Sequence, residues 1–533
     1  MNCLALETDE GILVIDCGIT FPEDDHGIEL LHPNLSYLFE RAERVRGVFL
    51  THGHEDHMAA LPFLLPKLNV PVWGPAHALK LALRRVRERH GDASVLKVDF
   101  RPALPGQVYQ VGPFKVEPVR VSHSIIEATA LYVETSAGSL VHTGDFKFDM
   151  DPPDGQPTDE QRLEELGARG VDLLLSDSTN VESQGSSGSE SGVADALETV
   201  IARAEKRVVV GLFSSNVQRL ISLGKIAERT GRKIGLLGRS LRTHVEAAHD
   251  LGHLAWNSEY RLTSDEIATC RPANLLVLAG GTQAEVGSAM ARMAHAEHPA
   301  LSLASGDSVI LSSRVIPGNE RRVSRMLSNL LRLDIDLHTH STSRDLHTSG
   351  HANRDELLRM IELVRPRCFI PVHGTRHHLH YHAALARDAG VAQCMVIENG
   401  QVAELSEGRL RRTDQVASGV VAIDRGHSTL APGVLRERAT LGRTGILQLC
   451  LVLDQDGVLR GPAQLSTWGV ATFDEPAAAA KLAREAEQLL QKQSQLWLER
   501  GRDAALELEK FLSWRLERLI GARPQVSVQI HRI

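Results

Sequence analysis

The chain has 533 residues with a formal net charge of −8, which neither supports nor excludes a nucleic-acid partner, because a groove can be locally basic. That length is too great for one hydrophobic core and predicts two or three domains. No apolar run approaches the about 20 residues of a membrane span, which indicates no membrane association. The six cysteines form no C-x-x-C pair, and the first ten residues have no basic segment. We therefore expect free thiols, no signal peptide and a cytoplasmic location.

In chain order, two short strands are expected at 3–6 and 11–16, joined by a turn. A buried strand at 48–50 then leads into the segment Thr51-His52-Gly53-His54-Glu55-Asp56-His57 and a helix at 58–64. His52 and His54 alternate in an extended segment and can point the same way. Asp56 and His57 follow at the helix start and point elsewhere, so this one loop can serve two metal ions. Without cations, such crowding would cost desolvation and repulsion.

More residues of the metal-ligand type follow at strand ends farther along the chain. His123 lies between expected strands at 114–119 and 130–135. Asp145 follows a glycine after the strand that contains His142, which we interpret as structural, and its position suits a carboxylate that bridges two cations. The buried run 368–373 ends in His373, and we interpret the four histidines that follow, at 377, 378, 380 and 382, as solvated surface residues. Asp16, at the end of the second strand, is a candidate to support the metal site from behind its ligands.

Residues 192–348 alternate regularly between strands and helical segments, a pattern typical of a parallel sheet covered on both faces. The expected elements include strands at 233–237, 275–279 and 308–311 and a helix at 320–331. A Gly/Ser-rich loop at 184–191 precedes this region. After about residue 440, the expected elements are a strand at 446–453, a helical region at 476–519 interrupted by Gly501, and a strand at 525–530. No catalytic pattern is found in this last region, and its helices look suited to packing or association.

The ligand candidates fit two metal ions. His52, His54 and His123 suit one ion, Asp56, His57 and His373 suit the other, and Asp145 would bridge them. Imidazole and carboxylate donors without a thiolate fit Zn²⁺ or Mn²⁺. Two cations about 3.5–4 Å apart can share a hydroxide and clamp the oxygens of a displacement reaction, which predicts hydrolysis.

The whole pattern resembles the metallo-β-lactamase superfamily, and the inserted domain with Asp177 and His351 resembles its β-CASP branch. More closely, the motifs resemble those of the bacterial ribonuclease J family; they are Leu50–His57, Asp177-Ser178-Thr179-Asn180, Ile316-Pro317-Gly318-Asn319-Glu320, His347-Thr348-Ser349-Gly350-His351 and Pro371-Val372-His373-Gly374. The resemblance implies an α/β fold, a metallo-β-lactamase αββα sandwich interrupted by a β-CASP parallel α/β domain, with a small α+β C-terminal domain. The expected boundaries are 1–190 and 349–438 for the sandwich, 191–348 for the β-CASP domain, and 439–533 for the C-terminal domain.

The resemblance also implies an activity, cleavage of single-stranded RNA by a 5′→3′ exonuclease that prefers a 5′-monophosphate and has endonuclease activity. The implied roles are mRNA decay and rRNA maturation, in a homodimer or homotetramer that has other RNA-degrading proteins as partners. The seven ligands named above carry over, with Asp56 also expected in catalysis. Asp177 would position His351, which would stabilise the scissile phosphate or protonate the leaving 3′-oxygen. Ser349, Gly350 and His351 match the segment that holds a nucleotide phosphate.

The sequence departs from the family pattern in two places. Family members usually carry a glycine-rich strand before the segment that matches Met1-Asn2, so we expect either a missing sheet edge or a start codon upstream. The loop at 181–191 is rich in Ser and Gly where the family tends to have an acidic, proline-containing sequence. Arginines of the inserted domain are candidates for RNA backbone contacts or are simply solvated charges; they include Arg239, Arg314, Arg321 and Arg322.

Two other functions compete with RNA hydrolysis. A small-molecule metallohydrolase of the same superfamily would not require the inserted domain or the Ser349-Gly350-His351 segment. An RNA-binding scaffold with a degenerate site is disfavoured because every ligand is present.

Overall fold

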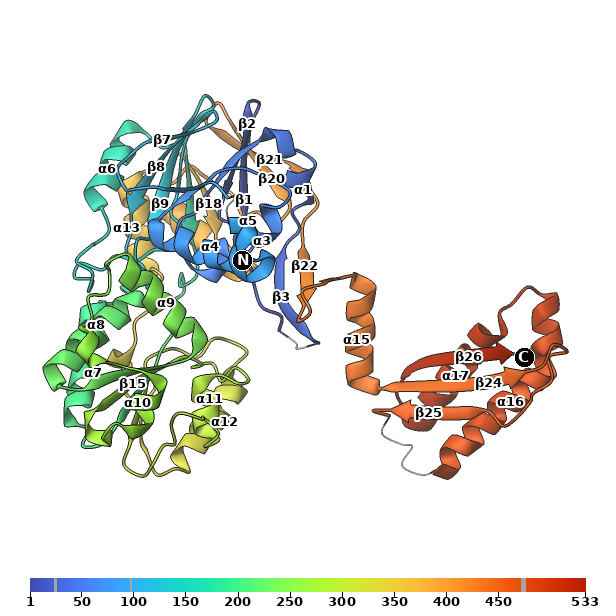
Figure 1. Cartoon of the computed structure of the whole chain (residues 1–533). Helices are drawn as coiled ribbons and strands as arrows, with labels where there is room; N and C mark the ends of the chain where they lie inside the picture. The colour runs from blue at the N-terminus through green and yellow to red at the C-terminus, as the bar shows by residue number, and fades with distance from the viewer. Residues whose placement is uncertain (24–25, 96–97, 471–475) are drawn as a thin grey trace. The chain divides into compact units, whose positions relative to one another are not determined.

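The computed structural model describes residues 1–23, 26–95, 98–470 and 476–533 (Figure 1). Contacts divide the chain into two units. The first comprises Met1–Thr20 and His32–Val420, and the second comprises Phe21–Leu31 and Val421–Ile533. The boundaries expected at 190, 348 and 438 separate domains by family likeness and stay predictions.

Two facing sheets form the sandwich of the first unit. The first sheet has the order β1 (Leu4–Thr8), β2 (Gly11–Ile15), β4 (Val45–Phe49), β5 (Val72–Gly74) and β6 (Phe100–Pro102). The second has the order β19 (Gln393–Cys394), β18 (Cys368–Val372), β11 (Leu173–Asp177), β10 (Gly138–His142), β9 (Thr129–Thr135), β8 (Phe114–Arg120) and β7 (Tyr109–Val111). The predicted hairpin at the start of the chain is confirmed, since β1 pairs antiparallel with β2.

Apolar side chains fill the space between these sheets. Leu13 and Phe49 of the first sheet belong to the same buried cluster as Val133 and Ile370 of the second. Helices form the outer layers: α4 (Ala76–His90) contacts β5 and β6, while α6 (Glu160–Arg169), α13 (Arg354–Val364) and α14 (Arg376–Asp388) supply residues to a second cluster on the other side. This arrangement is the αββα sandwich expected from the resemblance.

The chain leaves the sandwich after β11 and returns at α13, and a six-stranded sheet lies between these points. Its order is β14 (Arg261–Leu262), β13 (Lys233–Leu237), β15 (Leu275–Ala279), β12 (Val208–Gly211), β16 (Ser308–Leu311) and β17 (Asp336–Thr339). Every described pair in it is parallel, as predicted. Helix α7 (Glu190–Arg203) precedes the first of these strands, and the helices between the strands are α8 (Val217–Thr230), α9 (Arg239–Asp250), α10 (Ser264–Thr269), α11 (Ala289–Ala294) and α12 (Glu320–Leu331).

The second unit has a core of its own. Its sheet has the order β25 (Gln464–Trp468), β24 (Ile446–Leu453) and β26 (Gln525–Arg532). Leucines of β24, such as Leu447 and Leu449, pack against Leu490 of α16 (Pro476–Glu499) and Leu512 of α17 (Ala504–Ile520). None of the helices in the described ranges is both long and apolar enough to cross a membrane.

The predicted helix at 58–64 is wrong as a single element. The structure has two short helices here, α2 (Glu55–Met58) and α3 (Leu61–Leu64). The backbone of this segment bonds to Cys17 instead of continuing one helix, since the His57 carbonyl accepts from the Cys17 N–H at 2.6 Å and the Ala60 N–H donates to the Cys17 carbonyl at 2.9 Å. A side chain at Gly18 would lie 1.7 Å from the Asp56 carbonyl oxygen, so glycine permits this close approach.

Candidate metal centre

Three histidines from two loops bring one nitrogen each to a common point. His52 and His54 lie in the loop between β4 and α2, and His123 follows β8. Nδ1 of His54 lies 3.1 Å from Nε2 of His52 and 3.0 Å from Nε2 of His123. All three rings are buried from solvent or nearly so. This geometry matches the predicted first ligand set, in which His52 and His54 point the same way.

Asp56, His57 and His373 form a second set beside the first. Nε2 of His373 lies 3.2 Å from Oδ2 of Asp56, and Nε2 of His57 lies 3.5 Å from the same oxygen. His373 comes directly after β18, 317 residues beyond Asp56 along the chain. The return of the chain after the inserted domain therefore completes this set.

The carboxylate of Asp145 lies between the two sets. Oδ2 is 3.6 Å from Nε2 of His52 and 3.2 Å from Nε2 of His57, and Oδ1 is 3.6 Å from Nε2 of His373. Oδ1 is buried and has no hydrogen-bond partner among the described residues. A buried carboxylate oxygen without a donor, surrounded by imidazole nitrogens, fits a bridging metal ligand. The donor atoms of each set lie within 4.8 Å of one another, which suits a divalent cation.

A group of contacts behind the ligands fixes the orientation of their rings. Asp16 receives a hydrogen bond from Nδ1 of His57 at 2.8 Å and another from the Thr51 hydroxyl at 2.8 Å. Nδ1 of His123 donates to the Gly350 carbonyl at 2.6 Å. In both His57 and His123 the bond engages Nδ1 and leaves Nε2 directed toward the site, as is usual for ligating histidines.

Two residues at the centre have a left-handed backbone that side chains rarely adopt. The φ angles are +60° at Asp16 and +52° at His373, and both residues directly follow a strand. Conformations of this kind cost free energy and persist where the surrounding structure holds them, commonly at functional sites. Here the backbone turn directs each side chain from a strand end into the site.

The electrostatics divide the histidines into two classes. Burial lowers the pKa of His52 and His123 well below that of an ordinary imidazole, and lowers that of His54 to about 4, so these rings are neutral. Burial also opposes the charge on His57, but Asp145, Asp56 and Asp16 outweigh it and raise the pKa of His57 to about 10. Without a cation, the carboxylates are thus balanced by protonated imidazoles, and a metal ion would replace those protons.

His351 lies at the edge of this centre, held by Asp177 at the end of β11. Oδ2 of Asp177 accepts a hydrogen bond from Nδ1 of His351 at 2.8 Å, and Oδ1 accepts from the Thr179 hydroxyl at 2.7 Å. Although burial opposes a charge on His351, Asp177 and Asp145 raise its pKa above the ordinary value. His351 therefore lies beside the candidate ligands with its orientation fixed through Nδ1 and its protonated form favoured by the neighbouring carboxylates.

The segment before His351 packs closely against the loop of His123. A Cβ at Gly350 would lie 2.8 Å from the Ser124 hydroxyl and 2.9 Å from Cε1 of His123, so a larger residue would displace one of these side chains. Asn180 donates to the Ser349 hydroxyl at 2.8 Å and to the His351 carbonyl at 3.1 Å. The structure thus places Ser349, Gly350 and His351 together next to the candidate metal ligands.

Sequence reasoning missed several of these contacts. The Thr179 hydroxyl lies 2.8 Å from Nδ1 of His373, and the Asn2 amide nitrogen lies 2.9 Å from Nε2 of His57. Thr179 lies within the Asp177-Ser178-Thr179-Asn180 motif, but the motif alone does not predict a contact of its hydroxyl. The expectation that His382 is a solvated surface residue is wrong, because it is fully buried and its Nδ1 lies 2.9 Å from the Ser178 hydroxyl.

Family models match three parts of the chain. The model for the metallo-beta-lactamase superfamily matches residues 2–167, that for the ribonuclease J beta-CASP domain matches 205–330, and that for the Zn-dependent metallo-hydrolase RNA specificity domain matches 340–396. These matches agree with the sandwich, the inserted sheet and the return of the chain to the sandwich.

Curated relatives extend the likeness over most of the chain. Ribonuclease J of Mycolicibacterium smegmatis is 37% identical over 90% of this chain and 86% of its own length. Ribonuclease J of Synechocystis is 31% identical over 99% of this chain and 83% of its own length. Among solved structures, a protein of unknown function from Enterococcus faecalis has the same fold, with a TM-score of 0.51, 15% identity and coverage of 77% of this chain and 96% of its own. The chain therefore belongs to the ribonuclease J family.

Proposed function

We propose that this chain is a metal-dependent ribonuclease that degrades single-stranded RNA from the 5′ end, prefers a 5′-monophosphate and also cleaves internally. The observation that carries this proposal is the pair of ligand sets joined by Asp145, with the Asp177–His351 pair directly beside them. Membership of the ribonuclease J family supports it.

Seven side chains would hold two divalent cations, which we propose are Zn²⁺ or Mn²⁺; they are His52, His54, His123, Asp145, Asp56, His57 and His373. When bound, the cations would supply Lewis-acid activation of water and neutralise phosphate charge. Asp145 contacts both ligand sets, so it would keep the two ions together. Asp56 would act in catalysis through the ion that it holds.

His351 would donate the proton that the leaving 3′-oxygen needs. Its Nδ1 is engaged by Asp177 at 2.8 Å, so Nε2 is the nitrogen available to substrate. A positioned imidazolium of this kind contributes typically about 10²–10⁴-fold to such a step. Asp177 would act as a positioning residue, because it fixes the ring and favours its protonated form.

Ser349, Gly350 and His351 would bind the phosphate of the nucleotide at the centre. The Ser349 hydroxyl is oriented by Asn180 at 2.8 Å, and it accepts from the His351 N–H at 3.1 Å. Close packing at Gly350 keeps this segment against the His123 loop. The phosphate would therefore lie beside the ligands and His351.

The biological setting is proposed from the family. We propose roles in mRNA decay and rRNA maturation in the cytoplasm, with the chain acting as a homodimer or homotetramer and with other RNA-degrading proteins as partners. Light scattering of the purified protein would test the oligomeric state.

The activity is tested with purified protein, Zn²⁺ or Mn²⁺, and RNAs of one sequence that carry a 5′-monophosphate, 5′-triphosphate or 5′-hydroxyl. We expect metal-dependent release of mononucleotides, fastest from the monophosphate RNA. A circular RNA of the same sequence has no ends, so its cleavage reports endonuclease activity alone. No cleavage of any of these RNAs with either metal would overturn the proposal.

A further inference from the structure

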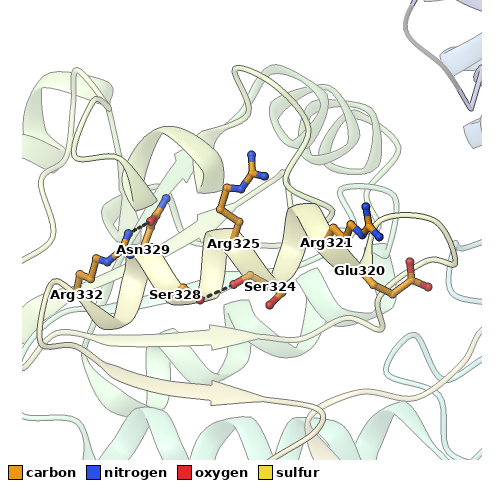
Figure 2. A pocket seen from close by; sticks show the side chains of 7 residues that line it. All are labelled: Glu320, Arg321, Ser324, Arg325, Ser328, Asn329 and Arg332. Atoms are coloured by element: carbon orange, nitrogen blue, oxygen red, sulfur yellow. Dashed lines mark hydrogen bonds between the residues drawn. The ribbon is translucent and has the colours of Figure 1, made fainter. Parts of the chain in front are cut away.

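One helix of the inserted domain presents exposed arginines that form no ion pair with a carboxylate in the described parts of the chain. Helix α12 (Glu320–Leu331) buries Val323, Met326 and Leu330 against the parallel sheet. Its opposite face is lined by Glu320, Arg321, Ser324, Arg325, Ser328, Asn329 and the adjoining Arg332, which we call the α12 face. Figure 2 shows its arginines spread along the helix, with Arg321 and Arg332 at opposite ends and Arg325 between them. The arginines are exposed.

The arginines form a row because of their spacing. Arg325 follows Arg321 by one helical turn, and Arg332 comes about two turns later on the same side. At a rise of about 1.5 Å per residue, the row from Arg321 to Arg332 is about 16 Å long. A row of this length and regularity suits a linear, repeating partner.

No carboxylate of the described chain neutralises this row. None lies within 4.0 Å of the guanidinium groups of Arg321, Arg322 or Arg325 in the described ranges. The one acidic residue of the face, Glu320, accepts a hydrogen bond from the Gly318 N–H at 2.9 Å. Arg332 donates to the Asn329 side-chain oxygen at 2.6 Å, which orients its guanidinium but leaves its charge unbalanced.

Helix stability does not explain these arginines. Arg321 and Arg322 lie in the first turn, where the helix dipole favours acidic residues and disfavours basic ones. Arg321 and Arg325 are like charges one turn apart, which is also unfavourable. Residues that destabilise their own helix are expected where they contribute to the binding of a partner.

The chemistry of the face favours a phosphate backbone as its partner. All the residues that line it are polar, so it lacks the apolar or aromatic anchors on which protein–protein interfaces depend. Binding of a nucleic-acid backbone is mostly electrostatic and needs no such anchors. We propose that the α12 face binds the sugar–phosphate backbone of single-stranded RNA, outside the metal centre and without sequence specificity. This inference rests on the proposed function, since it assigns a further contact to the same substrate.

The test compares two triple variants of the full, metal-loaded chain. The first is Arg321→Gln/Arg325→Gln/Arg332→Gln. The control is Arg409→Gln/Arg411→Gln/Arg412→Gln, which removes three exposed arginines of β21 (Arg409–Gln415) that also lack a carboxylate partner in the described chain. Both are made with and without His351→Ala, so that binding to an RNA of about 30 nucleotides is measured with little cleavage. Affinity is measured between 50 and 300 mM salt, and circular dichroism checks the fold.

We expect the α12 variant to lose at least tenfold in affinity at low salt. Because each phosphate contact contributes about 0.7 to the slope of log K against log salt for single strands, the slope should be less steep by about 2. The control should keep the slope of the parent. An unchanged slope in the α12 variant, or an equal change in the control, would overturn the inference.

Three further outcomes separate this inference from its alternatives. If the parent binds a poly-glutamate peptide and the α12 variant does not, while the two proteins bind RNA equally, the face is a protein-binding surface and the inference is wrong. Metal-dependent cleavage by the parent together with an unchanged salt slope overturns only the role of α12. If the metal-loaded parent, which retains His351, cleaves no RNA, the proposed function itself is overturned.

Discussion

Nε2 of His253 lies 2.6 Å from Oε1 of Glu127, and this contact links the inserted domain to the loop that carries His123. The other oxygen of Glu127 accepts from the backbone N–H of His77 at 2.8 Å, at the start of α4. Glu127 has a φ of +59°, so its backbone is held in a conformation that a side chain rarely adopts. One carboxylate thus joins the inserted domain, α4 and the ligand loop.

Glu127→Ala should therefore weaken RNA binding more than metal binding. It removes a charge-assisted hydrogen bond, for which about 1.5–3 kcal/mol is typical. Solvent screening lowers this contribution here, because both side chains are partly exposed. We expect KM for RNA to rise about three- to tenfold, with metal content unchanged by elemental analysis. Lys80→Met is the matched control, because it removes the ion pair of Lys80 with Asp250 (2.7 Å), which joins α4 to α9 without touching the ligand loop. A similar rise in both variants would contradict a specific role for Glu127.

His351→Ala should slow chemistry and leave the metal centre intact. The ring adjoins the ligand sets but is absent from the two groups that we assign to the metals. We expect kcat to fall about 10²–10⁴-fold in single-turnover assays, with two metal ions still bound. Asp177→Asn should lower kcat less and shift its pH dependence, because it removes the charge that raises the pKa of His351. Loss of metal from His351→Ala would refute the role given to that residue.

Asp145→Ala should change metal stoichiometry, because Asp145 contacts both ligand sets. We expect the number of tightly bound ions to fall from two to one or none and turnover to be lost. His142→Gln is a useful control in the same region, since Nδ1 of His142 accepts from the Gly144 N–H at 3.1 Å and the ring is in neither ligand set. Elemental analysis after dialysis measures both variants, and two retained ions in Asp145→Ala would contradict the bridging role.

The sequence predicts most elements, and the structure brings together the seven side chains that the sequence offers as metal ligands, because strand ends and ligand-type side chains are local features. Helix α12 and strands β13, β15 and β16 have the bounds that periodicity predicts. The supporting contacts were less accessible to sequence reasoning, because they join segments far apart in the chain. The bond from His123 to the Gly350 carbonyl spans 227 residues, and a backbone carbonyl leaves no mark in a sequence pattern.

His382 shows a second limit of sequence reasoning. Four histidines between 377 and 382 look like a polar surface, and His377 is indeed exposed. His382, however, lies on the side of α14 that also buries Ala383 and Ala386, and its ring packs edge-on against Phe369 at 4.8 Å. A neutral imidazole with one hydrogen bond is compatible with a core, so residue type alone does not decide its location.

A buried ion pair should make Arg219 important for the stability of the inserted domain. Arg219 and Glu190 are each 1% exposed and lie 2.8 Å apart, and Arg219 also donates to the Ser312 carbonyl at 2.7 Å. Arg219→Met would leave the Glu190 carboxylate buried without its partner, so we expect a loss of about 3–5 kcal/mol in unfolding free energy. Urea denaturation measures the change. The double variant Glu190→Gln/Arg219→Met should recover part of the loss, and equal instability in single and double variants would contradict this explanation.

Two buried histidines at the contact between α4 and α9 should make that contact sensitive to acid. The rings of His77 and His244 lie 6.1 Å apart, and neither nitrogen of His77 nor Nδ1 of His244 has a hydrogen-bond partner among the described residues. Burial lowers the pKa of His77 to about 4 and that of His244 to about 3, and Arg84 and Arg85 lower the latter further.

The sign of the pH effect follows from these lowered values. Between the folded-state pKa and the unfolded-state value of about 6.5, the unfolded chain binds a proton at each histidine and the folded chain does not. Proton binding by the unfolded chain therefore favours unfolding below about pH 6.5. The folded chain has its full stability above that pH and loses stability as the pH falls toward 4. His244→Gln removes one of these protons, so the slope of unfolding free energy against pH in this range should decrease by about 1.4 kcal/mol per unit.

Urea midpoints at pH 4.5, 5.5, 6.5 and 8 test this prediction. The metal centre also titrates in acid, but it contributes equally to both proteins, so the difference between parent and His244→Gln isolates the one histidine. His249→Gln is the matched control, because His249 is an exposed histidine of the same helix. We expect the parent and the control to lose stability in parallel below pH 6.5 and His244→Gln to lose less. Parallel curves for all three proteins would mean that His244 is protonated in the folded chain, against the burial that the structure shows.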